Sequence, residues 1–312
     1  MGLSARWHAL PPKLRGIVWV ALSGLLYALL NVFTLLPELG LNSYVMAFLL
    51  YFFGATFLLP IVFRVGVAGI LHTDRPGLHV LRGALHTAGM MLWFVALPIT
   101  PLAEITALGF TVPIFVTIGA AVLLAEEVRL RRWIAVLIGI AGAMIIIRPG
   151  FGEVGFGEAG LGALCVLVST PFFAASNLIS KALARTDSAN TIVVWQHVVI
   201  VTCAAPFAIW FWEMPEWNEV LWFLAAGLCG TLGHLCLQRG YQLADITLLQ
   251  PIGFLALLWN TMFGFLLFDQ RPDAWIFVGA VVVFGSALYI SHREVVRQSG
   301  VRSGDTPTGP MT

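Results

Sequence analysis

Residues 82–150 read RGALHTAGMMLWFVALPITPLAEITALGFTVPIFVTIGAAVLLAEEVRLRRWIAVLIGIAGAMIIIRPG, and this stretch decides the fold. It contains most of one apolar run, 80–99, and the whole of two more, 102–125 and 132–148. A helix that crosses the hydrocarbon core of a bilayer needs roughly 20 predominantly apolar residues. Each run is close to that length, and charged or Pro-containing segments separate the runs. The stretch therefore predicts three consecutive transmembrane helices.

The same pattern extends over nearly the whole chain. Apolar residues make up 59% of the 312 residues and charged residues 11%, whereas soluble domains carry about 25% charged residues. We therefore expect an all-α membrane protein. Its ten transmembrane helices are predicted at 16–37, 43–63, 80–99, 102–125, 132–148, 159–182, 190–211, 219–243, 246–268 and 273–291. The lipid bilayer is an expected partner, and a net charge of +1 argues against a nucleic-acid partner.

The distribution of Lys and Arg predicts the orientation in the membrane. If the N-terminus is cytoplasmic, all of the 17 Lys and Arg except Arg148 and Arg271 fall on the inner side. Cytoplasmic loops of membrane proteins carry this excess of basic residues. We expect the N- and C-termini to be cytoplasmic, with a disordered tail at 292–312.

Two short motifs indicate an internal repeat. Leu102–Thr106 reads LAEIT at the start of the fourth predicted helix, and Leu243–Thr247 reads LADIT near the start of the ninth. The copies occupy the same place in a five-helix count, so residues 1–150 and 151–291 are predicted repeats. Because five is odd, the second repeat enters the membrane from the opposite side. Inverted repeats with a binding site near the midplane are an architecture of secondary transporters.

The stretch 82–150 resembles the EamA domain of the drug/metabolite transporter superfamily. The resemblance rests on Ala96-Leu97, Ala103-Glu104, Pro113, Glu126-Glu127 and the small residues between Trp133 and Pro149. A degenerate second copy is carried by Gln250-Pro251, Phe268-Asp269 and the segment 275–285. The resemblance implies a ten-helix carrier of the bacterial inner membrane, with a central cavity between two halves. Its cargo would be an amino acid, a vitamin, a nucleoside-like compound or a similar small organic solute.

Polar and aromatic side chains at membrane depth are the candidate residues for substrate binding, because polar groups in hydrocarbon need partners or water. The candidates are Tyr27, Asn31, Tyr51, His86, Trp93, Glu104, Phe110, Asn177, Gln196, His197, His234, Gln238, Gln250, Trp259 and Asn260. The amides favour a neutral, zwitterionic or singly charged solute over a polyanion. Arg82 and Arg239 lie near the inner surface, where snorkelling to water is the expected behaviour.

Several of these candidates have a second interpretation. Glu104 either binds a substrate amine or a proton, or is an acid at a helix N-terminus favoured by the helix dipole. Each membrane histidine either exchanges a proton or forms a hydrogen bond between helices. Pro113, Pro171 and Pro251 lie inside predicted helices, where each removes a backbone hydrogen bond and permits either a gating bend or a packing kink.

The sequence thus predicts a secondary transporter that works by alternating access, driven by protons or by exchange. It contains no GxxxxGK[ST] loop for ATP and no HExxH or paired-Cys pattern for zinc, so we expect neither a cofactor nor a metal. The alternatives are a membrane transferase and a structural subunit of a larger membrane complex. One chain holds a complete pathway, which is compatible with a monomer or a homodimer.

Overall fold

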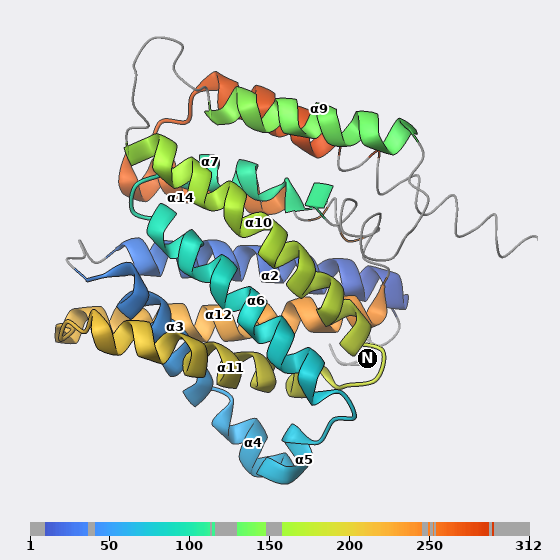
Figure 1. Cartoon of the computed structure of the whole chain (residues 1–312), viewed down its shortest axis with the longest axis vertical. Coiled ribbons are helices and arrows are strands. Elements are labelled where there is room, and N and C mark those ends of the chain that lie inside the picture. The colour runs from blue at the N-terminus through green and yellow to red at the C-terminus, as the bar shows by residue number, and fades with distance from the viewer. Residues whose placement is uncertain are drawn as a thin grey trace, which may run out of the picture.

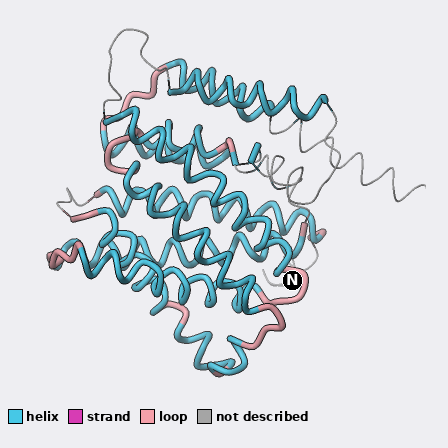
Figure 2. The backbone as a smooth tube through the Cα atoms, in the orientation of Figure 1, coloured by secondary structure: helices cyan, strands magenta, loops and turns pink. Residues whose placement is uncertain are grey.

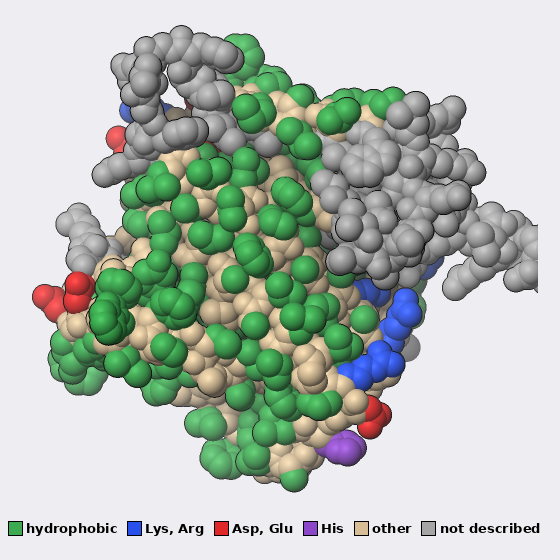
Figure 3. Space-filling view, in the orientation of Figure 1, with side chains coloured by type: hydrophobic (Ala, Val, Ile, Leu, Met, Phe, Trp, Pro, Cys, Tyr) green, Lys and Arg blue, Asp and Glu red, His purple; other side chains and the backbone are tan. Residues whose placement is uncertain are grey.

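The structure is a computed structural model that describes residues 10–36, 41–112, 114–115, 130–147, 158–244, 249, 252, 254–286 and 289. All regular secondary structure in these residues is helical (Figure 2). Hydrophobic side chains are spread across the middle of the face seen in Figure 3, and the visible charged side chains lie mainly at two opposite edges. This distribution is that of a protein whose middle faces lipid.

The helices fall into two sets along the chain, which we call the first half and the second half (Figure 1). The first half contains α2 (Pro12–Leu35), α3 (Ser43–Thr56), α4 (Leu59–Val65), α5 (Val67–Leu71), α6 (Pro76–Ala96), α7 (Leu102–Gly109) and α9 (Leu130–Ile147). The second half contains α10 (Glu158–Leu183), α11 (Ala189–Trp210), α12 (Trp217–Leu243), α14 (Phe254–Phe268) and the helix Ala274–Ser286. Each of the ten predicted ranges contains a described helix, so the predicted all-α membrane fold is confirmed.

One predicted span is broken. The range 43–63 forms α3 and α4, which meet at an angle of 42°. Pro60 is the physical reason, because it has no N–H to donate to the carbonyl of Thr56 and so ends the hydrogen-bonding pattern of α3. Beyond the bend, α4 and α5 form the lowest part of the view in Figure 1.

Packing between the halves follows an approximate two-fold symmetry. The first helix of the first half, α2, packs against α12, the third helix of the second half. In the same way α10, the first helix of the second half, packs against α6, the third transmembrane helix of the first half. The pairs α3 with α11 and α7 with α14 each join equivalent helices. This pattern is what two inverted repeats produce when they pack face to face.

Glycines allow the two halves to approach closely. A Cβ on Gly233 would lie 2.9 Å from the ring of Tyr27, and a Cβ on Gly89 would lie 3.1 Å from the ring of Phe173. Both rings belong to the first helix of one half and both glycines to the third helix of the other half. Gly227 of α12 is packed even more tightly, because its Cβ would lie 2.7 Å from the backbone nitrogen of Gly54 in α3.

Substitution of Gly227 tests this close approach. We expect Gly227→Ala to lower the free energy of unfolding by about 1–3 kcal/mol, the usual effect of overpacking, because backbone atoms of α3 cannot yield as a side chain can. The midpoint of thermal unfolding in detergent measures the effect. Gly285→Ala is the matched control, since a Cβ there meets nothing within 4 Å. Equal midpoints for the two variants would contradict the contact between α12 and α3.

Candidate functional site

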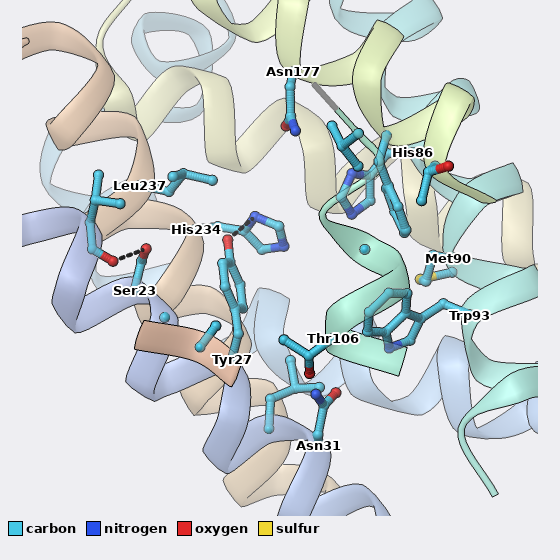
Figure 4. Close-up of a pocket in the computed structure, with 18 of the residues that line it drawn as sticks. Ser23, Tyr27, Asn31, His86, Met90, Trp93, Thr106, Asn177, His234 and Leu237 are labelled. Carbon is cyan, nitrogen blue, oxygen red and sulfur yellow. Dashed lines mark hydrogen bonds between the residues drawn. The ribbon is translucent and has the colours of Figure 1, made fainter. Parts of the chain in front are cut away.

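A cavity of about 390 Å³ lies between the two halves (Figure 4). Most of its lining comes from α2, α3, α6 and α7 of the first half and from α10, α12 and α14 of the second. The lining residues are Val20, Ser23, Gly24, Tyr27, Leu30, Asn31, Leu50, Tyr51, Arg82, His86, Met90, Trp93, Phe94, Thr106, Gly109, Phe110, Val112, Thr170, Phe173, Asn177, His234, Leu237, Gln238, Tyr241, Leu249, Ala256 and Asn260. Such a mixture of aromatic faces with a few polar groups is typical of sites for small organic ligands.

The structure brings most of the sequence-predicted candidates together at this cavity. Those that line it are Tyr27, Asn31, Tyr51, His86, Trp93, Phe110, Asn177, His234, Gln238 and Asn260. Gln196 and His197 lie one layer behind, buried on α11. Glu104 and Trp259 are not in the lining. Pro171 lies inside α10 between the lining residues Thr170 and Phe173, whereas Gln250, Pro113 and Pro251 lie outside the described residues.

A chain of hydrogen bonds runs along one wall of the cavity. The hydroxyl of Tyr27 lies 2.8 Å from Nδ1 of His234, whose Nε2 lies 3.1 Å from the hydroxyl of Tyr51. The Tyr51 hydroxyl also lies 3.0 Å from Nε2 of His86. These four side chains come from α2, α12, α3 and α6, so the chain joins both halves through their interior.

The number of protons on these four side chains determines whether the hydrogen-bond chain can donate to a ligand or accept from it. A neutral imidazole has one donor and one acceptor, and a hydroxyl has one proton to donate. All three hydrogen bonds can therefore form in either of two arrangements, in which every donor and acceptor exchange roles. In one arrangement His234 donates to Tyr27, which leaves the Tyr27 proton free to donate to a bound solute. In the other, Tyr27 donates to His234 and its oxygen accepts from the solute.

Arg82 is the buried cation of the site, and the expectation that it snorkels to the inner surface is wrong. Only 3% of the residue is exposed, although it lies more than one turn inside α6. Its side chain is held by α11, where Nη2 donates to Oε1 of Gln196 at 2.7 Å and Nη1 donates to the carbonyl of Ile192 at 3.2 Å. These bonds replace the water that snorkelling would supply.

Amides complete the polar lining. Asn31 donates from Nδ2 to Oδ1 of Asn260 at 3.1 Å, which links α2 to α14. Gln238 accepts at Oε1 from the hydroxyl of Ser180 at 2.8 Å and keeps its NH₂ group for other partners. Asn177 of α10 stands at the edge of the open space in Figure 4. In the described part of the chain, no group of His, Cys, Asp and Glu could hold a metal ion.

A repeat that could have located the site is visible only once α2 and α10 are compared. Residues 20–31 read VALSGLLYALLN and residues 166–177 read VLVSTPFFAASN. The shared positions place Tyr27 opposite Phe173 and Asn31 opposite Asn177, and all four side chains line the cavity. The LAEIT and LADIT copies lie on other helices and do not mark these positions.

Comparison with known proteins agrees with this architecture. The sequence profile of the EamA-like transporter family matches residues 14–148 and 160–292. The chain belongs to the EamA-like transporter family. A solved crystal structure that is 18% identical superposes with a TM-score of 0.63 and covers 91% of this chain and 98% of its own, which supports the fold alone.

Curated relatives of this EamA-like protein are named as carriers of small metabolites. A riboflavin transporter of Rhizobium johnstonii is 33% identical over 91% of this chain and 93% of its own. A riboflavin transporter of Vibrio cholerae is 30% identical over 93% of this chain and 97% of its own. An S-adenosylmethionine uptake transporter of Rickettsia prowazekii is 28% identical over 92% and 95%. The chain is thus a multi-pass secondary transporter of a small organic metabolite in the bacterial inner membrane.

Removal of one hydroxyl tests the hydrogen-bond chain. Tyr51→Phe removes the hydroxyl that bonds Nε2 of His86 and Nε2 of His234, while the bond from Tyr27 to Nδ1 of His234 remains, so we expect the free energy of unfolding to fall by about 1–3 kcal/mol. Thermal unfolding in detergent measures this change. Tyr44→Phe is the control, because Tyr44 packs on Phe211 and its hydroxyl has no hydrogen bond among the described residues. A Tyr51→Phe variant as stable as the control would show that the hydrogen bonds of Tyr51 do not hold the helices together.

Proposed function

We propose that this EamA-like transporter carries riboflavin or a closely related neutral flavin. Two relatives of at least 30% identity bear the name riboflavin transporter, and the alignments cover nearly the full length of each chain. The observation that carries the proposal is the composition of the cavity wall. It combines aromatic faces with amides and one hydroxyl–imidazole chain, and the described lining contains no carboxylate.

A flavin matches this wall in its two parts. The flat tricyclic ring offers a large surface for stacking against aromatic side chains such as Tyr27, Trp93 and Phe173. Its carbonyl and N–H groups, together with the hydroxyls of its polyol chain, need both donors and acceptors. Asn31, Asn177 and the Tyr27 hydroxyl provide both, so a neutral polar solute can leave water without losing its hydrogen bonds.

The charge of the cavity favours a flavin over the second candidate, S-adenosylmethionine. That compound carries a carboxylate, which Arg82 can pair with, but also a sulfonium and an ammonium group, for which the described lining holds no Asp or Glu. Arg82 supplies a positive charge to the wall, and Glu104 is not in the described lining. A neutral flavin has no cation that needs an acidic partner in the cavity wall, whereas S-adenosylmethionine has two.

Transport by alternating access follows from the equivalent contacts of the two halves. We propose that residues 1–150 and 151–291 are the moving units and that both termini are cytoplasmic, with 292–312 as a tail outside the described residues. The Tyr27–Gly233 and Phe173–Gly89 contacts are equivalent under exchange of the halves. Tightening one and loosening the other would therefore switch the open side of the cavity at little energetic cost. A single chain suffices for this cycle, and no catalytic step is part of it.

Asn177 provides the test in the intact protein. In proteoliposomes we expect saturable uptake of riboflavin, and we expect Asn177→Ala to lower uptake at a limiting concentration by about 2- to 10-fold, the effect of one lost hydrogen bond. Asn190→Ala on α11 is the matched control, since Asn190 does not line the cavity.

The same vesicles separate the two candidate substrates. Uptake of S-adenosylmethionine in place of riboflavin would overturn the proposed substrate. Equal riboflavin uptake by the Asn177 and Asn190 variants would overturn the proposed site.

A further inference from the structure

We infer that Arg82 is the specificity-determining residue of the cavity. It recognises an edge of the solute on which a carbonyl oxygen and a neighbouring ring nitrogen both accept hydrogen bonds. This role rests on the proposed flavin substrate and adds to it the part of the flavin that the protein binds.

The first observation is an unbalanced charge at membrane depth. Arg82 is buried, it lines the cavity, and it forms no ion pair with any Asp or Glu of the described residues. The titratable side chains around it are the tyrosines Tyr27, Tyr51 and Tyr241 and the histidines His86, His197 and His234. A charge in this position is expensive and typically marks a functional site.

The second observation is the set of donors that Arg82 keeps unused. A guanidinium has five N–H donors in a planar fork. Gln196 and the Ile192 carbonyl take one donor each, and Nε has no hydrogen-bond partner among the described residues. Because Gln196 is itself fully buried, the short 2.7 Å bond to Nη2 fixes the plane of the fork before a ligand arrives.

The chemistry of the fork selects its ligand. Arginine binds two adjacent acceptors at once, as it does with the carbonyl oxygen and ring nitrogen on the major-groove edge of guanine. The flavin ring has two edges of the same kind, each with a carbonyl oxygen beside an unprotonated ring nitrogen. Ribose and polyol hydroxyls lack this planar pair. A lysine ammonium is a point donor and cannot reproduce the fork.

A buried cation in the cavity is compatible with a neutral substrate. A positive fork strengthens hydrogen bonds to neutral acceptors without requiring a formal negative charge on the solute. It also disfavours solutes that present a cation or only donors to this part of the wall. Arg82 would thereby exclude many small metabolites that the aromatic wall alone would accept.

The ratio of the Kd of a ring analogue to the Kd of riboflavin tests the inference. Purified full-length protein in detergent is titrated with riboflavin, 5-deazariboflavin and 1-deazariboflavin, and the change in ligand fluorescence gives each Kd. Each analogue replaces one ring nitrogen with a C–H group and so damages one edge. We expect the wild-type protein to bind one of the two analogues about 5- to 150-fold more weakly than riboflavin.

Variants then assign that preference to Arg82. In Arg82→Lys and Arg82→Gln the preference for riboflavin over the weaker analogue is expected to fall close to 1. Arg239→Lys is the matched control, because Arg239 lies over the ring of Trp19 and outside the cavity lining, and it should keep the wild-type ratio. A purely structural role of Arg82 would weaken all three ligands alike and leave the ratio unchanged.

Two results would overturn the inference while leaving the proposed function intact. One is a wild-type protein that binds riboflavin and both analogues equally well, a result that does not depend on any variant folding. The other is an Arg82→Lys protein that keeps the wild-type ratio. A wild-type protein that binds none of the three flavins would instead refute the proposed function, and the inference with it.

Discussion

A polar group buried in the hydrocarbon core of a bilayer must find its partner within the protein, and this requirement organises the centre of the molecule. Tyr51 satisfies two imidazoles at once, from α6 and α12, and it can do so only if α3 lies close to both helices. The backbone contact between Gly54 and Gly227 provides that closeness. The cavity forms beside this network, where Arg82 and the amides retain donors that no described side chain uses.

The near-symmetry of the halves links this centre to transport. Tyr27 and Phe173 are equivalent residues, and each packs on a glycine of the opposite half. Equivalent contacts allow the halves to exchange conformations with a small difference in free energy, as alternating access requires. The chemistry of the two sides differs, because Tyr27 carries a hydroxyl bonded to His234 whereas Phe173 packs its ring 5.2 Å from that of His86 without a hydroxyl. We therefore assign the equivalent ring–glycine contacts to the movement of the halves, and the Tyr27 hydroxyl, which has no counterpart on Phe173, to the orientation of the solute.

The sequence predicted the fold more completely than the site. The spans followed from apolar length alone, because a membrane helix must satisfy its own backbone and needs a fixed number of residues to cross. The break at Pro60 was missed because hydropathy does not register a lost N–H. Arg82 was misplaced for a similar reason, since its burial depends on Gln196 and Ile192 of α11, partners more than 100 residues away in the sequence. Gln196 and His197 were expected at the cavity, but the rotation of α11 that places them behind it is set by packing against α3 and α6.

Counterflow tests the central claim, that one cavity between inverted halves opens alternately to the two sides. Proteoliposomes are loaded with excess unlabelled riboflavin and diluted into a trace of labelled riboflavin. The account predicts a transient accumulation of label above its external concentration, because each outward trip of the unlabelled compound returns the cavity for an inward trip. Uptake that rises only to equilibrium, at a rate unaffected by the trapped riboflavin, would contradict alternating access to a single flavin site.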